Sequence, residues 1–288
     1  MFDYPALYDT ASKLSSNSQV NYLRLIFGEY LLLFIAAVFS MELNDSRLYY
    51  GVYAFVFLGS FVVLITRSWL KPEQDWYKGR ALAESIKTSC WRYCMRAEPF
   101  ADAHSVLIPR SEFRNYLRAI LESNRHIGDR LPPDKAAADQ ITQTMEVTRS
   151  LSLEERKSVY QKHRIAEQRK WYAKKASANK SASKRWFFVA GCAYAIALGL
   201  VIFRIVYNSV DVWPIEPVIV VASSIIGWTQ VKKFNELASS YTLTAHEIGI
   251  LQGKIDEVTD ETSLSSFINE SEQAFSREHT QWVARQTS

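Results

Sequence analysis

Two uncharged and strongly apolar stretches constrain this chain more than any other feature of its sequence. They cover residues 48–66 (LYYGVYAFVFLGSFVVLIT) and residues 186–203 (WFFVAGCAYAIALGLVIF). An apolar helix of about 18 residues or more is long enough to cross a hydrocarbon core of about 30 Å, whereas runs of about 10–14 residues are typical of buried core helices. We therefore predict that both stretches are membrane-spanning helices.

Each of these stretches has an apolar neighbour in the sequence. Residues 23–41 are apolar apart from Arg24 and Glu29, and residues 212–231 are interrupted near their start by Glu216. Aromatic residues mark the ends of the stretches, as in the interfacial belt of membrane proteins: Tyr49, Tyr50, Trp69, Trp186, Trp213 and Trp228. We predict an all-α integral membrane protein whose four spans, at about 23–41, 48–68, 186–207 and 212–231, form two hairpins.

The distribution of Lys and Arg predicts the orientation of these spans. The connector 42–47 has one Arg and no Lys, and the connector 207–211 has neither. Basic residues flank the opposite ends of the spans: Arg67, Lys71, Lys78, Arg80, Lys180, Lys184, Arg185, Lys232 and Lys233. The positive-inside rule then places both termini and the middle of the chain in the cytoplasm. Because Cys90 and Cys94 would lie in that reducing compartment and Cys192 in the bilayer, we expect no disulfide.

The chain reads as two similar modules joined by a linker. The first module covers 1–125, the linker 126–150 and the second module 151–288. In each module a pair of spans leads through a tryptophan, Trp69 or Trp228, into a cytoplasmic helix.

Local signals predict the helices between the two pairs of spans. Ser111 is placed as the N-cap of a helix that reaches about residue 123. Pro132 and Pro133 end the helical region, a new helix is predicted from Asp134, and a second stop is predicted near Ser150.

The segment 151–207 contains no proline, and we expect one helix that continues into the third span. At about 1.5 Å per residue it would be roughly 80 Å long, a rigid lever between cytoplasm and membrane. Residues 154–185 hold eleven Lys or Arg against three Glu, a net charge of +8. Lipid headgroups explain the basic residues near the membrane, but those farther out lie beyond the Debye length of about 8 Å.

The outer basic residues therefore predict an anionic ligand or an acidic partner segment. The candidate ligand residues are Arg156, Lys162, Arg164, Arg169, Lys170, Lys174 and Lys175. An alternative partner lies in the chain itself, because its C-terminal stretch is acidic and would dock on the basic helix. The acidic residues of that stretch are Asp256, Glu257, Asp260, Glu261, Glu270, Glu272 and Glu278.

Other patterns concern helix packing and conduction. Ile248, Leu251, Ile255 and Val258 recur at a spacing that predicts a packed helix face. Gly191, Ala195 and Gly199, and likewise Ser223 and Gly227, are spaced for close approach of membrane helices, within one chain or between subunits. Acidic residues in or beside the spans are candidates for a pore lining or a cation-selective mouth: Glu29, Asp45, Asp211 and Glu216.

The motifs of catalysis are incomplete in this sequence. His246 and Glu247 lack the second histidine of a zinc-binding HExxH motif, and Cys90 and Cys94 lack a second pair of metal ligands. A Gly-rich phosphate loop and a GxSxG motif are also missing from the sequence. We expect a protein that is not an enzyme and that uses no cofactor or metal.

The segments ITQTMEVTRS and ERKSVYQKHRIAEQRKWYAKKA, followed by a membrane pair, resemble the bacterial SLATT family, the two-transmembrane effectors associated with SMODS nucleotidyltransferases and SLOG proteins. WYKGRALAESIK in the first half, with Pro99 and Phe100 after it, resembles another branch of the family. The matching positions are Thr142, Met145, Arg149, Arg156, Tyr160, Arg164, Ile165, Gln168, Trp171, Tyr172, Lys175, Ala176, Trp76, Arg80, Ala83 and Glu84.

The resemblance implies an inner-membrane effector of anti-phage defence that carries no catalytic residues. Such an effector is expected to form an oligomeric pore that depolarises the membrane and stops growth or kills the cell. Its partners would be the bilayer, further copies of the chain and a nucleotide or oligonucleotide made by a partner nucleotidyltransferase, but not duplex DNA. Two alternatives remain open: a non-conducting scaffold that recruits cytoplasmic proteins, and a secondary transporter.

Overall fold

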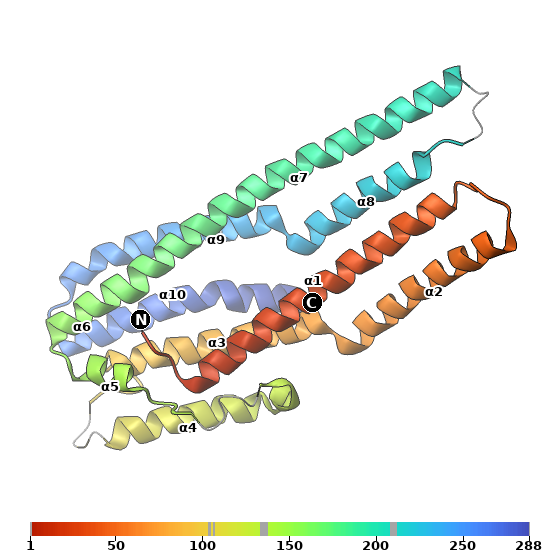
Figure 1. Ribbon diagram of the computed structural model, residues 1–288. Coiled ribbons are helices and arrows are strands. Elements are labelled where there is room, and N and C mark those ends of the chain that lie inside the picture. The colour runs from red at the N-terminus through yellow and green to blue at the C-terminus, as the bar shows by residue number, and fades with distance from the viewer. Residues whose placement is uncertain (1, 103–104, 106, 133–137, 208–211, 288) are drawn as a thin grey trace. The chain divides into compact units, whose positions relative to one another are not determined.

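A computed structural model describes residues 2–102, 105, 107–132, 138–207 and 212–287. Every regular element in these ranges is a helix (Figure 1). In chain order the elements are α1 Ala6–Phe39, α2 Arg47–Leu70, α3 Pro72–Cys94, α4 Leu107–Ser123, η1 Arg125–Arg130, α5 Gln143–Ser150, α6 Leu153–Tyr160, η3 Gln161–Ala166, α7 Glu167–Val206, α8 Ile215–Lys232, α9 Phe234–Gly253, η4 Lys254–Glu257 and α10 Glu261–Thr287.

The helices form two compact units that do not follow the order of the chain. The polar unit consists of Met1–Gln19, Glu73–Lys175 and Ser240–Ser288, and the apolar unit of Val20–Pro72 and Ala176–Ser239. The long helices α1 and α7 and the helix α9 contribute residues to both units. Both halves of the sequence therefore build each unit.

Three helical stretches are long and apolar enough to cross a membrane, judged by length and composition in the described part of the chain. They are Ala6–Phe39, Arg47–Cys94 and Leu153–Val206. The fourth predicted span corresponds to α8, which has 18 residues with Glu216 in its first turn and Lys232 in its last, and its crossing stays a prediction. No residue of α2 is buried, and Phe55 is 72% exposed. An apolar surface of this kind needs lipid or protein to cover it.

The two halves end their second apolar helix in the same way. Lys71 after α2 and Lys233 after α8 both adopt the left-handed conformation, with φ of 43° and 48°. Each lysine donates its backbone N–H to the carbonyl four residues before it, at 3.0 Å and 2.9 Å. A polar helix then starts at the next residue, Pro72 or Phe234. The repeat seen in the sequence therefore has a counterpart in the local structure.

Several predicted helix boundaries differ from the structure. Helix α4 starts at Leu107 rather than after Ser111, because Pro109 falls in its first turn, where the missing N–H is not needed. The predicted start at Asp134 lies outside the described residues, and α5 begins at Gln143. Helix α1, Ala6–Phe39, contains nearly all of the predicted span 23–41 and extends it toward the N-terminus. The predicted stop near residue 150 is confirmed, and Ser152 then caps α6 through a capping box.

The basic segment forms the continuous helix that its sequence predicts. α6, η3 and α7 follow one another from Leu153 to Val206 without a non-helical residue. Within this run, η3 is a π-helix over Gln161–Ala166. Short π-helical insertions are rare in proteins, but those that occur often lie at functional sites. This one contains Arg164.

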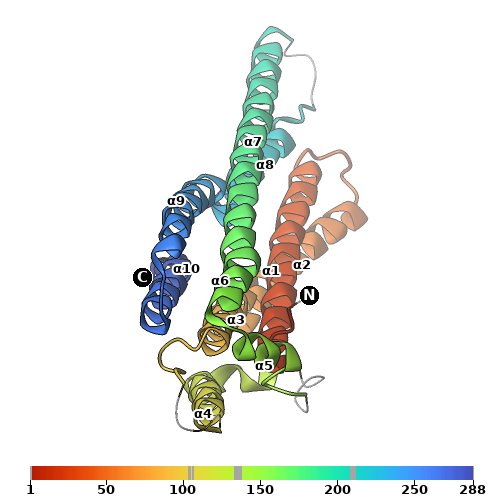
Figure 2. The same cartoon turned by 90° about the vertical axis from the view of Figure 1, so that its left-hand side faces the viewer.

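The core of the polar unit is built from both ends of the chain. Trp91 of α3 is fully buried, stacks on Phe2 and meets the ring of Tyr160 edge-on at 5.6 Å. In both views α10 lies beside α6 (Figures 1 and 2).

The predicted packed face is confirmed, because all four of its members are buried: Ile248, Leu251, Ile255 and Val258. All three cysteines are free, and two of them, Cys90 and Cys94, are buried.

A half-buried carboxylate in this unit makes its stability depend on pH. Arg110 donates to both oxygens of Glu146, at 3.0 Å and 2.8 Å, and the hydroxyl of Tyr93 donates to the same carboxylate at 2.8 Å. These hydrogen bonds, that of Arg110 first, lower the pKa of Glu146 below its ordinary value. A lowered folded pKa stabilises the fold above about pH 4.3, and that contribution is lost as the pH falls through the folded pKa.

We expect Glu146→Gln to lower the free energy of unfolding at pH 7 and to flatten its decline between about pH 5 and pH 3. Denaturant titrations of the purified protein at a series of pH values measure both effects. The relevant quantity is the difference between wild type and variant, since other carboxylates titrate in the same range. A difference that stays constant over this range contradicts the assignment.

Candidate functional site

Arg164, one of the predicted ligand residues, lies in the interior of the polar unit. Its side chain is 1% exposed, and that of its partner Glu272 on α10 is 0% exposed. Nε of Arg164 donates to Oε1 of Glu272 at 2.9 Å, and Nη2 donates to Oε2 at 2.6 Å. Tyr160 and Thr88 donate their hydroxyls to the same carboxylate, at 2.9 Å and 3.0 Å. This arrangement joins α3, α6, the π-helix and α10.

Electrostatics favour the charged form of Arg164 although its side chain is buried. Burial disfavours the charged guanidinium, but attraction to Glu272 outweighs this effect and raises the pKa of Arg164 above its ordinary value. Burial raises the pKa of Tyr160 well above its ordinary value, and the charge of Glu272 adds to this shift. The hydroxyl of Tyr160 therefore stays protonated and keeps donating its hydrogen bond.

Arg156 is held in the same way about two turns earlier. Its side chain is fully buried, ion-paired with Glu261 at the start of α10, and donates to the carbonyl of Met95 at 2.8 Å. Lys157 donates to the carbonyl of Val258 at 2.7 Å. At Arg156 and Arg164, therefore, the acidic C-terminal stretch docks on the basic helix, as the alternative prediction has it. The guanidinium groups of both arginines are paired with carboxylates inside the protein.

The other five predicted ligand residues are exposed: Lys162, Arg169, Lys170, Lys174 and Lys175. Two of them have partners in their own unit. Arg169 donates to the side chain of Gln252 at 3.0 Å, and Lys175 lies over the ring of Trp171 at 5.7 Å. Binding of an anion at these five positions stays a prediction.

The predicted pore residues occupy separate places. Glu29 forms an ion pair of 3.4 Å with Arg67 of α2, inside the apolar unit. Asp45 is exposed in the connector between α1 and α2. Glu216, in the first turn of α8, lines an apolar cavity of 410 Å³. Asp211 lies outside the described residues. Whether any of them faces a pore stays a prediction.

The small residues in the apolar unit behave in two ways. A Cβ at Gly191 or Gly199 of α7 would meet no atom within 4 Å, so this face is uncovered in the single chain. At Gly227 of α8, in contrast, the hydroxyl of Tyr30 of α1 occupies the place of a Cβ. The predicted close approach is therefore confirmed for Gly227 within one chain.

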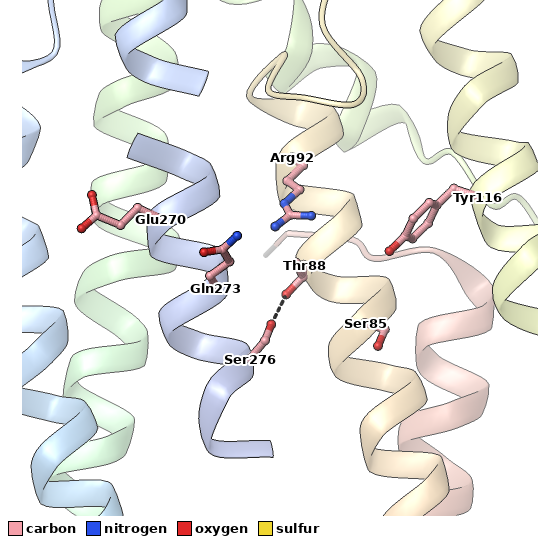
Figure 3. A pocket seen from close by; sticks show the side chains of 7 residues that line it. All are labelled: Ser85, Thr88, Arg92, Tyr116, Glu270, Gln273 and Ser276. Atoms are coloured by element: carbon pink, nitrogen blue, oxygen red, sulfur yellow. Dashed lines mark hydrogen bonds between the residues drawn. The ribbon is translucent and has the colours of Figure 1, made fainter. Parts of the chain in front are cut away.

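A cleft of 590 Å³ lies between α3, α4 and α10 in the polar unit, and it is not among the sites that the sequence predicts. Figure 3 shows Gln273 and Ser276 of α10 facing Thr88 of α3, while Tyr116 of α4 points toward α3 from the other side. Each residue that lines it has a polar group in its side chain: Ser85, Thr88, Arg92, Tyr116, Glu270, Gln273 and Ser276.

Hydrogen bonding within the cleft leaves one side-chain nitrogen of Arg92 without a partner atom. Nε of Arg92 is buried and has no hydrogen-bond partner in the described part of the chain. Glu270, by contrast, is paired with Lys254 at 2.7 Å. Thr88 Oγ1 lies 3.4 Å from the hydroxyl of Ser276 and donates to Glu272. Thr88 therefore connects the cleft to the buried Arg164–Glu272 pair.

A signal for the cleft was present in the sequence. Ser85, Thr88 and Arg92 are spaced by three and four residues, and Glu270, Gln273 and Ser276 by three, so each set follows one face of a helix. These faces look like ordinary solvated faces as long as the packing of α3 against α10 is unknown.

Comparison with known families divides the chain into two parts. Residues 5–157 match the family described as SMODS and SLOG-associating 2TM effector domain 3. Residues 160–282 match the family described as SMODS and SLOG-associating 2TM effector domain 1. No curated protein and no solved structure matches the chain at a significant level.

Proposed function

This chain belongs to the SMODS- and SLOG-associating two-transmembrane (SLATT) effector family, with two such domains in tandem, and on that premise we propose that it is a pore-forming membrane effector of bacterial anti-phage defence. Effector domains of this family are associated with SMODS and SLOG defence systems. In the proposed function, an oligomer in the inner membrane conducts ions, depolarises the cell and stops its growth.

One observation carries the proposal more than any other. The continuous helix from Leu153 to Val206 has a first part fixed by two fully buried arginines, Arg156 and Arg164. Its last part is apolar and exposed, with Phe187 82% and Ile205 76% exposed. A helix of this kind can transmit a change in its buried ion pairs to an apolar segment without an intervening break.

The proposed pore is built from four spans per chain, contributed by the apolar parts of α1 and α7 and by α2 and α8. Both chain termini lie in the cytoplasm, in accord with the positive-inside rule. Because four helices are too few to enclose a wide pore, several chains assemble around it. Glu29, Asp45, Asp211 and Glu216 supply acidic groups to the pore or its mouth and favour cations.

The proposed signal is a nucleotide or oligonucleotide made by a partner enzyme. The exposed basic residues raise its local concentration near the cytoplasmic helices by electrostatic attraction: Lys162, Arg169, Lys170, Lys174 and Lys175. A non-conducting scaffold is the second candidate, supported by the same basic surface, which equally suits an acidic protein segment.

We expect the triple charge reversal Lys162→Glu, Lys170→Glu and Lys174→Glu to weaken the response to the signal. Induced expression together with the partner nucleotidyltransferase, in cells loaded with a membrane-potential dye, measures that response. Wild type should depolarise the cells, and the variant should do so several-fold more slowly at equal protein level. Arg114→Glu with Arg118→Glu, on the exposed face of α4, is the matched control.

The scaffold predicts a different outcome. Wild type would leave the potential unchanged, and the triple variant would lose a co-purifying acidic protein. That result would refute conduction and favour the second candidate.

A further inference from the structure

We propose that the cleft between α3, α4 and α10 is the ligand site of this effector and that it binds a phosphate group of a nucleotide-sized molecule through Arg92. This inference rests on the proposed function and adds to it the site at which the signal is read. The basic residues of α6 to α7 then attract the ligand, and the cleft holds it.

The hydrogen-bonding groups of the cleft favour an anion. The guanidinium of Arg92 is always charged and has donors in a fork that matches phosphate geometry. Because its Nε is buried without a partner, a phosphate oxygen would replace a hydrogen bond that the fold leaves unmade. The hydroxyls of Ser85, Thr88 and Tyr116 are further donors along the same cleft.

Neighbouring carboxylates do not prevent this binding, because each has its own cation. Glu270, which lines the cleft, is paired with Lys254, and Glu272, behind Thr88, is paired with Arg164. Among these groups, Arg92 is the one whose charge no carboxylate of the described residues neutralises. The local balance is therefore positive toward an incoming anion.

The size and the aromatic wall of the cleft favour a nucleotide over a free inorganic anion. Its volume of 590 Å³ lies inside the range of about 300–1,000 Å³ typical of small-molecule sites. Tyr116 is 37% exposed, and Phe100 supports its ring edge-on at 5.8 Å. A supported and accessible aromatic ring is the usual platform for stacking a base.

Thr88 provides the connection from ligand to helix. A threonine hydroxyl has one proton to donate, and here Glu272 receives it at 3.0 Å. A phosphate oxygen that accepts the same proton removes one hydrogen bond from the carboxylate that holds Arg164 in the π-helix. Occupation of the cleft thus weakens the contact between α10 and the helix that continues into α7.

The test is direct binding to the full-length protein in lipid nanodiscs by titration calorimetry. The probes are ATP, a cyclic diadenylate and inorganic phosphate. We expect Arg92→Gln to bind the best nucleotide probe about 10- to 100-fold more weakly than wild type, and Arg92→Lys to lose less. Arg114→Gln, on an exposed position of α4 outside the cleft, should bind as wild type does.

A second variant separates stacking from charge and does not depend on Arg92. Tyr116→Ala should weaken nucleotide binding about tenfold and leave the affinity for inorganic phosphate unchanged. Equal affinities of wild type and Arg92→Gln, or no binding of any probe to wild type, would overturn the inference.

The failure of this inference and the failure of the proposed function give different results. A protein that binds nucleotide through Arg92 but never conducts ions would support the cleft as the ligand site and refute the pore. A pore whose response to nucleotide is equal in wild type and in Arg92→Gln would support the proposed function and refute the cleft as the ligand site.

Discussion

Replacing Glu272 by alanine is expected to lower the free energy of unfolding of the polar unit by about 3–5 kcal/mol. The substitution leaves Arg164 buried at 1% exposure with a charge that it cannot lose and without a partner. The hydroxyls of Tyr160 and Thr88 lose their acceptor as well. Hydrogen exchange of α10 in the protein reconstituted in nanodiscs, together with its thermal unfolding, measures the loss.

Glu270 provides the matched control on the same helix. Its pair with Lys254 is also short, at 2.7 Å, but the two side chains are 50% and 44% exposed. Glu270→Ala should therefore change stability by less than about 1 kcal/mol. Glu272→Gln should fall between the two, because an amide oxygen still accepts hydrogen bonds but does not neutralise Arg164. Equal losses for Glu270→Ala and Glu272→Ala would refute the role of the buried pair.

Gly79→Ala is expected to destabilise the polar unit by about 1–3 kcal/mol, although alanine is the better helix former. A Cβ at Gly79 of α3 would lie 3.0 Å from the backbone nitrogen of Ser15 and 3.2 Å from the carbonyl oxygen of Ala11. Both atoms belong to the backbone of α1, so no side-chain rotation relieves the contact. The hydroxyl of Ser15 donates to the carbonyl of Trp76 at 3.0 Å at the same crossing.

Gly253→Ala is the control for this substitution. A Cβ at Gly253, the last residue of α9, would meet nothing within 4 Å, and its φ of −68° suits any residue. Alanine there should be neutral or stabilising by up to about 1 kcal/mol. The midpoint of thermal unfolding should therefore fall for Gly79→Ala, and for Gly253→Ala it should rise or stay unchanged. A stabilised Gly79→Ala would show that α1 and α3 do not approach so closely.

The membrane character of the chain is the part of the fold that its sequence predicts best. An uncharged apolar stretch as long as 48–66 is typical of a membrane span and is longer than most core helices of soluble proteins. The absence of proline predicts the continuous helix from α6 to α7. The start of α4 is harder to predict, because Pro109 in its first turn resembles a helix stop unless its missing N–H falls where no hydrogen bond is needed. The division into two units was not predicted, since it depends on contacts between segments far apart in the sequence.

Net charge alone does not distinguish buried, ion-paired arginines from exposed basic residues that could bind a ligand. By charge alone, Arg156 and Arg164 belong with the exposed lysines of the same helix, although arginine is the residue suited to buried, bidentate ion pairs. Tyr160 lies between them at four-residue spacing, which indicates one packed face. Their partners are 105 and 108 residues away, a distance that local patterns do not span.

A second signal in α10 identifies Glu272 as unusual. The buried residues of this helix repeat at three- and four-residue spacing, and Glu272 occupies one of these core positions: Leu264, Phe267, Ile268, Ser271, Glu272 and Phe275. A carboxylate in such a stripe requires a buried cation. The helix faces that line the cleft around Arg92 are also regular in the sequence, but polar residues that line a ligand site and polar residues that face water look alike in a single sequence.

The measurement that tests the central claim most directly is the ionic conductance of the purified full-length protein in a planar bilayer. Currents are recorded at several salt concentrations, with nucleotides and short oligonucleotides added on the side that the positive-inside rule predicts to be cytoplasmic. We expect discrete current steps that a nucleotide ligand switches on or off. A silent bilayer that contains demonstrably inserted and oligomeric protein under every condition would contradict it.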